Sequence, residues 1–193
     1  MQATINQRHA QIFKLTDGRS PKILPALLIC LVVALGSGTS VAQPNKTAAP
    51  PDAQKAFDKM KALAGTWQGT IMGISIDVTI RLASSGTVIL HEATTSGGRP
   101  PNHEITMFYV EGDRLIATHY CDGGNRARFE GKLSPDEKTS EFSFLDVAGS
   151  TKGGLVKRMV FTTIDANKHV VEFTFIKPDG KPVDLRGEFE RTK

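Results

Sequence analysis

The stretch Gly65-Thr66-Trp67 decides the fold, because it stands where one helical pattern ends and a long series of strand patterns begins. Residues 52–63 carry apolar side chains at helical spacing, behind an aspartate of the kind that caps helix N-termini. Residues 74–82 alternate strictly between apolar and polar side chains, which is the period of a half-buried strand. The change of period predicts one helix followed by an all-β domain.

Further strand patterns follow at short, even spacing, and Gly, Asp, Asn, Ser and Pro fill the breaks between them. With the segments around Trp67 and at 74–82, we expect strands at 87–95, 103–111, 114–121, 126–133, 139–147, 155–164, 169–177 and 183–191. Many short strands without helices between them have to close or stack to protect their edges. We predict an all-β fold: an antiparallel up-and-down β-barrel of about ten strands with one short N-terminal helix.

The first 42 residues have the pattern of a signal peptide. Basic residues precede an apolar run at 23–35, and small residues end at Ala42. The run is shorter than the ~20 residues of a spanning helix and contains Pro25, so we expect no membrane anchor after cleavage. The expected organisation is a signal peptide at 1–42, a flexible linker at 43–51 and a barrel domain at 52–193, in a secreted or periplasmic protein.

Net charge and cysteine content exclude some classes of partner and an internal disulfide. The leader contributes most of the net charge of +4, so the basic pI argues for neither nucleic acid nor an anionic membrane as a partner. Cys121 is the one cysteine after the leader, which rules out an intrachain disulfide in the barrel domain. The sequence leaves the oligomeric state open.

With the strands placed, Gly65-Thr66-Trp67 resembles the opening motif of the lipocalin and fatty-acid-binding superfamily, the calycins. The segment from His103 to Arg128 looks like that of secreted bacterial lipocalin-like proteins of unassigned function. The resemblance implies a barrel that holds a small molecule, with the Trp closing the floor beside a basic residue of the last strand. Arg186 or Arg191 would be that residue. The resemblance implies no activity.

The Leu-x-Gly-x-Trp start at 63–67 and the ten strands are also similar to nitrobindin, a barrel that holds haem through one late histidine. The late histidine here is His169, which shares a strand face with Phe173 and Phe175. The terminal strand at 183–191 contains no histidine, and this departure argues against haem. We therefore expect no cofactor.

The candidate site lies in the middle hairpins. If Gly112-Asp113 and Gly123-Gly124 are two-residue turns, one sheet face carries Glu104, Thr106, His119, Cys121, Arg126, Arg128 and Glu130. The opposite face then carries Ile105, Met107, Tyr109, Ile116, Tyr120 and Phe129. An error of one residue in a turn exchanges these sets. The polar face is either a solvated exterior with cross-strand ion pairs or the lining of the interior, where an arginine receives an anionic group.

From this pattern we expect an exported barrel that holds an amphipathic, anionic small molecule. Arg128 and His119 would meet its polar end, and Trp67, Met107 and Phe129 would form apolar wall. The predicted ligand-binding residues are Arg128, His119, Glu104, Arg126, Cys121 and Trp67. The alternative is a lipocalin-fold enzyme with His119 or Glu104 as base and Tyr120 or Arg128 stabilising charge. The sequence identifies no catalytic residue.

Two narrower alternatives concern metal and thiol chemistry. A metal site would use His103, Glu104 and His119, but the chain has no compact H-x-H or C-x-x-C spacing, and zinc needs three or four converging ligands. No metal is expected. Cys121 is either a thiolate activated by Arg126 and His119 or a small buried hydrophobe.

Overall fold

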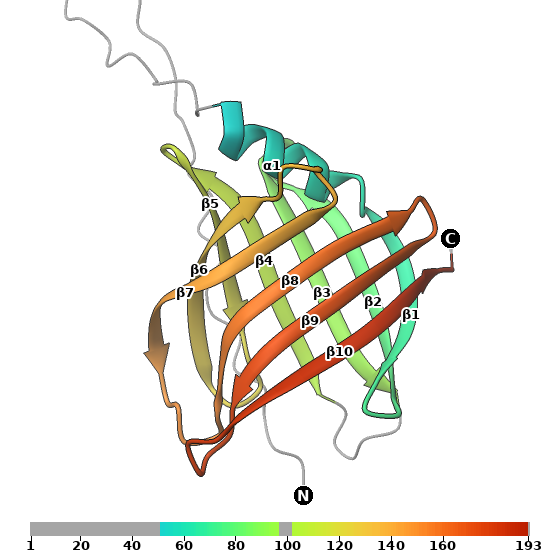
Figure 1. The fold of residues 1–193 in the computed structure, drawn as a ribbon. Coiled ribbons are helices and arrows are strands. Elements are labelled where there is room, and N and C mark those ends of the chain that lie inside the picture. The colour runs from blue at the N-terminus through green and yellow to red at the C-terminus, as the bar shows by residue number, and fades with distance from the viewer. Residues whose placement is uncertain (1–50, 97–101, 193) are drawn as a thin grey trace, which may run out of the picture. The chain divides into compact units, whose positions relative to one another are not determined.

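The computed structural model describes residues 51–96 and 102–192, which form a closed antiparallel barrel of ten strands with one helix (Figure 1). This confirms the predicted fold class. The predicted signal peptide and nearly all of the linker lie outside the described residues. The elements are α1 (Pro51–Lys61), β1 (Gly65–Ile71), β2 (Ile74–Ala83), β3 (Val88–Ser96), β4 (His103–Glu111), β5 (Arg114–Tyr120), β6 (Asn125–Leu133), β7 (Thr139–Gly149), β8 (Leu155–Asp165), β9 (Lys168–Ile176) and β10 (Pro182–Arg191).

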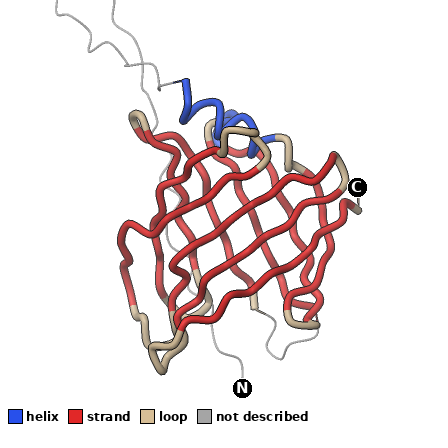
Figure 2. The backbone as a smooth tube through the Cα atoms, in the orientation of Figure 1, coloured by secondary structure: helices blue, strands red, loops and turns tan. Residues whose placement is uncertain are grey.

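Each strand pairs with the next one in the chain, and β1 pairs with β10 to close the barrel. Figure 2 shows the strands tilted around the barrel. At this seam Trp67 stands opposite Arg191, and the Thr192 amide donates to the Thr66 carbonyl at 2.8 Å. Closure pairs both terminal strands, so neither leaves an open sheet edge. Among the described residues, no helix is long and apolar enough to span a bilayer.

The helix α1 lies across one end of the barrel (Figure 1). Its Phe57 and Met60, together with Leu63 just after the helix, are buried in the same cluster as the barrel core. The apolar spacing predicted this inward face. We call this end of the barrel the closed end.

Trp67 seals the closed end from the first strand. Its side chain is 1% exposed, and its indole Nε1 donates to the Leu63 carbonyl at 2.8 Å. The Arg191 guanidinium lies over the indole ring, 4.1 Å from its centroid, and donates to the Ala64 carbonyl at 2.6 Å. The expected basic partner from the last strand is therefore Arg191. Arg186 instead bonds to Glu188 at the surface.

The inner face of the barrel is not buried evenly. At the closed end Phe108, Phe142 and Phe161 pack in mutual contact, with ring centroids 5.1–6.0 Å apart, and each is almost completely buried. Inward-facing side chains toward the opposite end are only partly buried. These are Ile71, Ile76, Ala93, Val147, Phe173 and Phe175. The side chains on that side therefore keep part of their contact with solvent, and we call it the open end.

The loop between β5 and β6 corrects one prediction. The expected two-residue turn is wrong, because the amide of Cys121, just after β5, donates to the Asn125 carbonyl at 3.0 Å, which leaves three residues, 122–124, between this pair. Gly124 has a φ of 84°, the left-handed conformation that typically ends a three-residue hairpin loop. The extra residue moves the register by one, so that His119 stands opposite Ala127 and not Arg128. The expected turn at Gly112-Asp113 is confirmed.

Candidate functional site

Three side chains from the middle hairpin meet on the inner face near the open end: Glu104 of β4, His119 of β5 and Cys121, which follows β5. The Cys121 thiol donates to Glu104 Oε1 at 3.4 Å, and His119 Nε2 lies 3.6 Å from Glu104 Oε2. One nitrogen, one sulfur and one oxygen atom of the three residues all lie within 4.8 Å of one another. We call Glu104, His119 and Cys121 the mouth cluster.

His119 is held in place by its cross-strand neighbour. Thr106 stands opposite it in the register, and the Thr106 hydroxyl bonds to His119 Nδ1 at 2.9 Å. The other ring nitrogen, Nε2, is buried and has no hydrogen-bond partner among the described residues. Burial lowers the pKa of His119, and the nearby Glu104 opposes this shift only in part. The imidazole is therefore neutral near neutral pH.

Cys121 is partly buried, and this burial raises the pKa of its thiol to about 11. The Gly123 amide donates to the sulfur at 3.4 Å, which lowers the pKa, whereas the Glu104 carboxylate raises it further. The sulfur is a protonated thiol near neutral pH. Arg126 was expected to stabilise a Cys121 thiolate, but it stands opposite Tyr120 on the outer face and lies on the other side of the sheet from the thiol.

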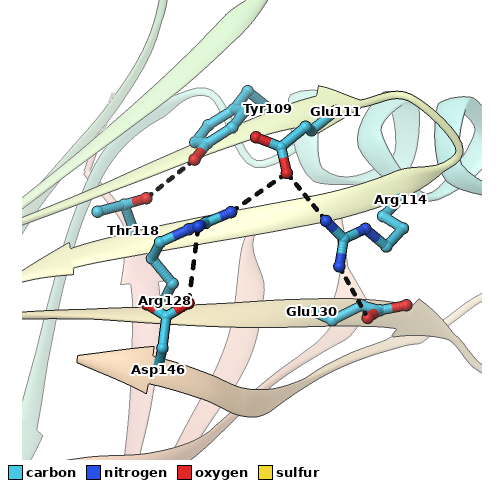
Figure 3. Close-up of polar contacts among 7 residues, drawn as sticks. All are labelled: Tyr109, Glu111, Arg114, Thr118, Arg128, Glu130 and Asp146. Atoms are coloured by element: carbon cyan, nitrogen blue, oxygen red, sulfur yellow. Dashed lines mark hydrogen bonds and ion pairs between the residues drawn. The ribbon is translucent and has the colours of Figure 1, made fainter.

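The register correction moves both predicted arginines out of the interior. Arg128 stands opposite Thr118 and bonds to Glu111 at 3.2 Å and to Asp146 at 3.6 Å (Figure 3). The expectation that Arg126 and Arg128 share a face with His119 is wrong for the reason given above, the third residue in the β5–β6 loop. The solvated-exterior interpretation therefore applies to β6, and the interior interpretation applies to the mouth cluster.

The outer arginines belong to a surface network of ion pairs. Figure 3 shows Arg114 between Glu111, at 3.0 Å, and Glu130, at 3.7 Å, with Arg128 on the other side of Glu111. Tyr109 bonds to Thr118 beside them at 3.1 Å. Exposed pairs of this kind contribute about 0–1 kcal/mol each to stability. Their arrangement ties β4, β5, β6 and β7 together from outside and brings none of these charges to the interior.

The other expected wall and site residues divide in the same way. Phe129 faces inward, as its pairing with Phe144 and Ala117 requires, whereas Met107 and Tyr120 lie on the outer face. Trp67 faces inward but belongs to the closed end. His103, considered as a metal ligand, lies outside the mouth cluster: its side chain is 53% exposed, with Nε2 3.9 Å from Glu92.

His169 lies at the closed end, where a haem does not fit. Its ring is fully buried, stacked on Phe189 at 5.3 Å and edge-on to Trp67 at 4.3 Å. Burial, reinforced by the positive charge of Arg191, lowers the pKa of His169 to about 4. An iron ligand needs a slot for the macrocycle beside its nitrogen, and here the rings of Trp67 and Phe189 occupy the space next to the imidazole.

Sequence reasoning did not assign a role to Thr106 or to the partly buried inner side chains Phe173 and Phe175. The signal for Thr106 was its cross-strand pairing with His119, which follows from the Gly112-Asp113 turn. The signal for the phenylalanines was the alternation within 169–177, which places them on one face. Only closure of the barrel brings β9 around to share the interior with β4 and β5.

Comparison with known proteins supports the fold. No protein-family model and no curated protein matches the chain. Among solved structures, Rv2717c from M. tuberculosis is similar over 76% of this chain and 100% of its own, with 12% identity and a TM-score of 0.57. A DUF3598-family protein from Nostoc punctiforme PCC 73102 shares 15% identity over 68% of this chain and 48% of its own, with a TM-score of 0.48. EF1p2_mFAP2b bound to DFHBI shares 13% identity over 71% and 99%, with a TM-score of 0.36. At 12% identity, the match to Rv2717c shows a common barrel fold alone.

Proposed function

We propose that this protein is an exported barrel that holds a small amphipathic molecule inside its open end. The observation that carries the proposal is the uneven burial of the inner face. Side chains at the closed end, such as Phe108 and Phe142, are fully buried, whereas Phe173 and Phe175 at the open end keep solvent exposure. A barrel sealed at one end and accessible at the other is the form in which small barrels bind ligands.

The polar end of the ligand would meet the mouth cluster. The expectation of an anionic ligand rested on Arg126 and Arg128, which lie outside. The interior instead presents the Glu104 carboxylate, together with a neutral imidazole and a thiol. A carboxylate accepts hydrogen bonds and attracts positive charge, so the protein's own side chains favour an end group that donates hydrogen bonds or carries a positive charge.

The acid–base alternative has less support. His119 is neutral near neutral pH and lies beside Glu104, as a general base would. Tyr120 and Arg128, the groups expected to stabilise developing charge, both lie on the outer face. Binding requires only the groups that are present, so we propose binding and assign no reaction.

A panel of fluorescent amphipaths tests the function. The probes share one alkyl chain and differ in their end group: carboxylate, amide or ammonium. We expect the parent protein to bind the ammonium and amide probes more tightly than the carboxylate probe. Glu104→Gln should lower the affinity for the ammonium probe about tenfold, because it removes a charge-assisted hydrogen bond worth roughly 1.4 kcal/mol. Ala93→Phe should weaken all three probes, because Ala93 faces inward beside Glu104.

The matched controls are Arg128→Ala and Arg114→Ala, two surface arginines of the same network. Both should leave all affinities unchanged. An equal loss of affinity in Arg128→Ala and Glu104→Gln would place the ligand outside the barrel. Failure of the parent to bind any probe would remove the support for a carrier of amphipaths.

A further inference from the structure

The mouth cluster brings together three different side-chain groups that can all bind a metal ion. A thiol, an imidazole and a carboxylate converge from residues 104, 119 and 121, with their donor atoms within 4.8 Å of one another. Thiolate, imidazole and carboxylate are together the ligand types of zinc. We propose that Glu104, His119 and Cys121 form a binding site for a thiophilic divalent cation, and that Zn²⁺ is the ion whose chemistry fits.

Two of the separations in the mouth cluster are close to the edge length of a zinc coordination tetrahedron. Bonds of about 2.0 Å to nitrogen and oxygen and about 2.3 Å to sulfur place neighbouring ligand atoms roughly 3.3–3.6 Å apart in tetrahedral geometry. Glu104 Oε2 lies 3.6 Å from His119 Nε2, and Glu104 Oε1 lies 3.4 Å from Cys121 Sγ. These two contacts use different oxygens of the carboxylate, and one ligand atom from each residue lies within 4.8 Å of the others, so the three side chains have to draw slightly closer around the ion.

The second, independent observation is the unpaired nitrogen of His119. Its side chain is 5% exposed, and its buried Nε2 has no hydrogen-bond partner among the described residues. The 3.6 Å to Glu104 is too long for a hydrogen bond, and an unpaired buried polar group costs about 1–3 kcal/mol. A cation between Nε2 and the carboxylate would satisfy both.

The surrounding contacts prepare the ligands. With Nε2 on the metal, the proton of His119 is on Nδ1, and this N–H donates a hydrogen bond to the Thr106 hydroxyl at 2.9 Å. The bond fixes the tautomer and the ring orientation. The Gly123 amide donates to the cysteine sulfur at 3.4 Å and stabilises negative charge there. On binding, the thiol becomes a thiolate, and its proton passes to solvent.

Three protein ligands leave a fourth position for water or for another donor. Glu104 keeps 35% of its side-chain exposure, so this position faces the accessible side of the barrel. The inference rests on the proposed function only for the occupant of this fourth position, where an end group with a free lone pair, such as an amide oxygen, would replace water; the ammonium end group would meet Glu104 only in the metal-free protein. Cation binding itself requires no organic ligand.

Metal titration of the full chain tests the site. Chelator-stripped protein is titrated with Zn²⁺ against a chromophoric chelator, and with Co²⁺ while absorption is recorded. We expect one Zn²⁺ per chain and a thiolate-to-cobalt charge-transfer band in the near ultraviolet. Cys121→Ser should abolish the band, and Glu104→Gln should weaken Zn²⁺ binding by about 100-fold or more. Thr106→Val, which removes only the orienting bond, should weaken it by about tenfold.

The controls are Cys30→Ser, which changes the other cysteine of the chain, and His103→Gln, which removes an exposed histidine outside the cluster. Both should bind Zn²⁺ like the parent, and circular dichroism should show that each variant is folded. Equal Zn²⁺ affinity in the parent and in Cys121→Ser, or Co²⁺ binding without the charge-transfer band, would overturn the proposal. Probe binding without Zn²⁺ binding would overturn this inference alone, and Zn²⁺ binding without probe binding would overturn the proposed carrier alone.

Discussion

At the scale of single residues, Trp67 is the side chain that joins the elements of the closed end. Its indole is enclosed by Arg191 on one face and by the edge contact with His169, and its nitrogen bonds to the Leu63 carbonyl. The helix, the first strand and the last strand therefore all contact one side chain. Removing the side chain removes apolar burial, a stacked cation and a buried hydrogen bond together.

We expect Trp67→Ala to lower the free energy of unfolding by about 3–5 kcal/mol, since a large buried aromatic leaves a cavity that the barrel cannot fill. Urea unfolding followed by circular dichroism measures the change. Tyr120→Ala, at a 39% exposed aromatic on the outer face, is the control and should cost much less. A loss below about 1 kcal/mol for Trp67→Ala would contradict the role assigned to the closed end.

At the scale of elements, the β5–β6 loop decides which side chains enter the barrel. Its three residues end on Gly124 with a positive φ, whereas the neighbouring Gly123 has no such conformation. A Cβ at Gly124 would meet nothing within 4 Å, and a Cβ at Gly123 would make ordinary contacts of 3.5 Å or more. The two glycines therefore differ in backbone strain and not in available space.

This difference gives a matched pair of variants. Gly124→Ala should destabilise the protein by about 1 kcal/mol, because an L-residue is strained at this φ. Gly123→Ala should change stability by less than about 0.5 kcal/mol. Urea midpoints of the two variants measured side by side would decide the matter. A larger loss for Gly123→Ala would mean that the loop has a different turn and the strands a different register.

The same loop shows which features of the fold can be predicted from the sequence and which cannot. Alternation of apolar and polar residues located the strand at 74–82, and turn residues at short, even spacing located the others, because these residues favour the backbone conformations of turns. The pairing of Thr106 with His119 was also predictable, since Gly112-Asp113 suits a two-residue turn. Two adjacent glycines after Asp122 fit both a two-residue and a three-residue loop, and sequence alone cannot separate them. That single ambiguity placed Arg126 and Arg128 on the wrong face.

A bulge in β7 is a second feature that limits the prediction of strand register from the sequence. The register between β6 and β7 shifts between Arg128 and Phe129, so that Arg128 stands opposite Asp146 and Phe129 opposite Phe144. The extra residue, Leu145, keeps inward side chains facing inward on both sides of the shift. The adjacent apolar residues Phe144 and Leu145 interrupt the alternation of 139–147, but the interruption alone does not say which residue lacks a partner, because bulges depend on the partner strand. The composition of the interior therefore required the three-dimensional pairing.

At the scale of the whole molecule, buried histidines connect stability to pH. Burial lowers the pKa of His91 to about 3 and that of His169 to about 4, and it lowers the pKa of His119 as well. An unfolded histidine titrates near 6.5, so below that pH the unfolded chain binds more protons than the folded one. Each of these histidines contributes stability that is complete above about pH 6.5 and is lost as the pH falls toward its folded pKa.

We therefore expect the free energy of unfolding to fall between pH 6.5 and pH 5, by at most about 1.4 kcal/mol per pH unit for each buried histidine. Urea unfolding at pH 7, 6 and 5 measures this slope. His91→Phe should flatten it, and His103→Gln, at an exposed histidine, should leave it unchanged. A slope that is the same in the parent and in His91→Phe would show that His91 is protonated in the folded protein.

The seam between β1 and β10 has a consequence for how the chain folds. Every other pairing joins strands that follow one another, so those hairpins form locally and fast. The seam alone joins the two ends of the barrel sequence, at Trp67 and Arg191, and it forms only when the other strands have assembled. Until then both terminal strands present unpaired edges, which makes the nearly complete barrel the intermediate most prone to aggregate. In pulse-labelled hydrogen exchange during refolding, the amides of β1 and β10 that face each other should be the last to gain protection.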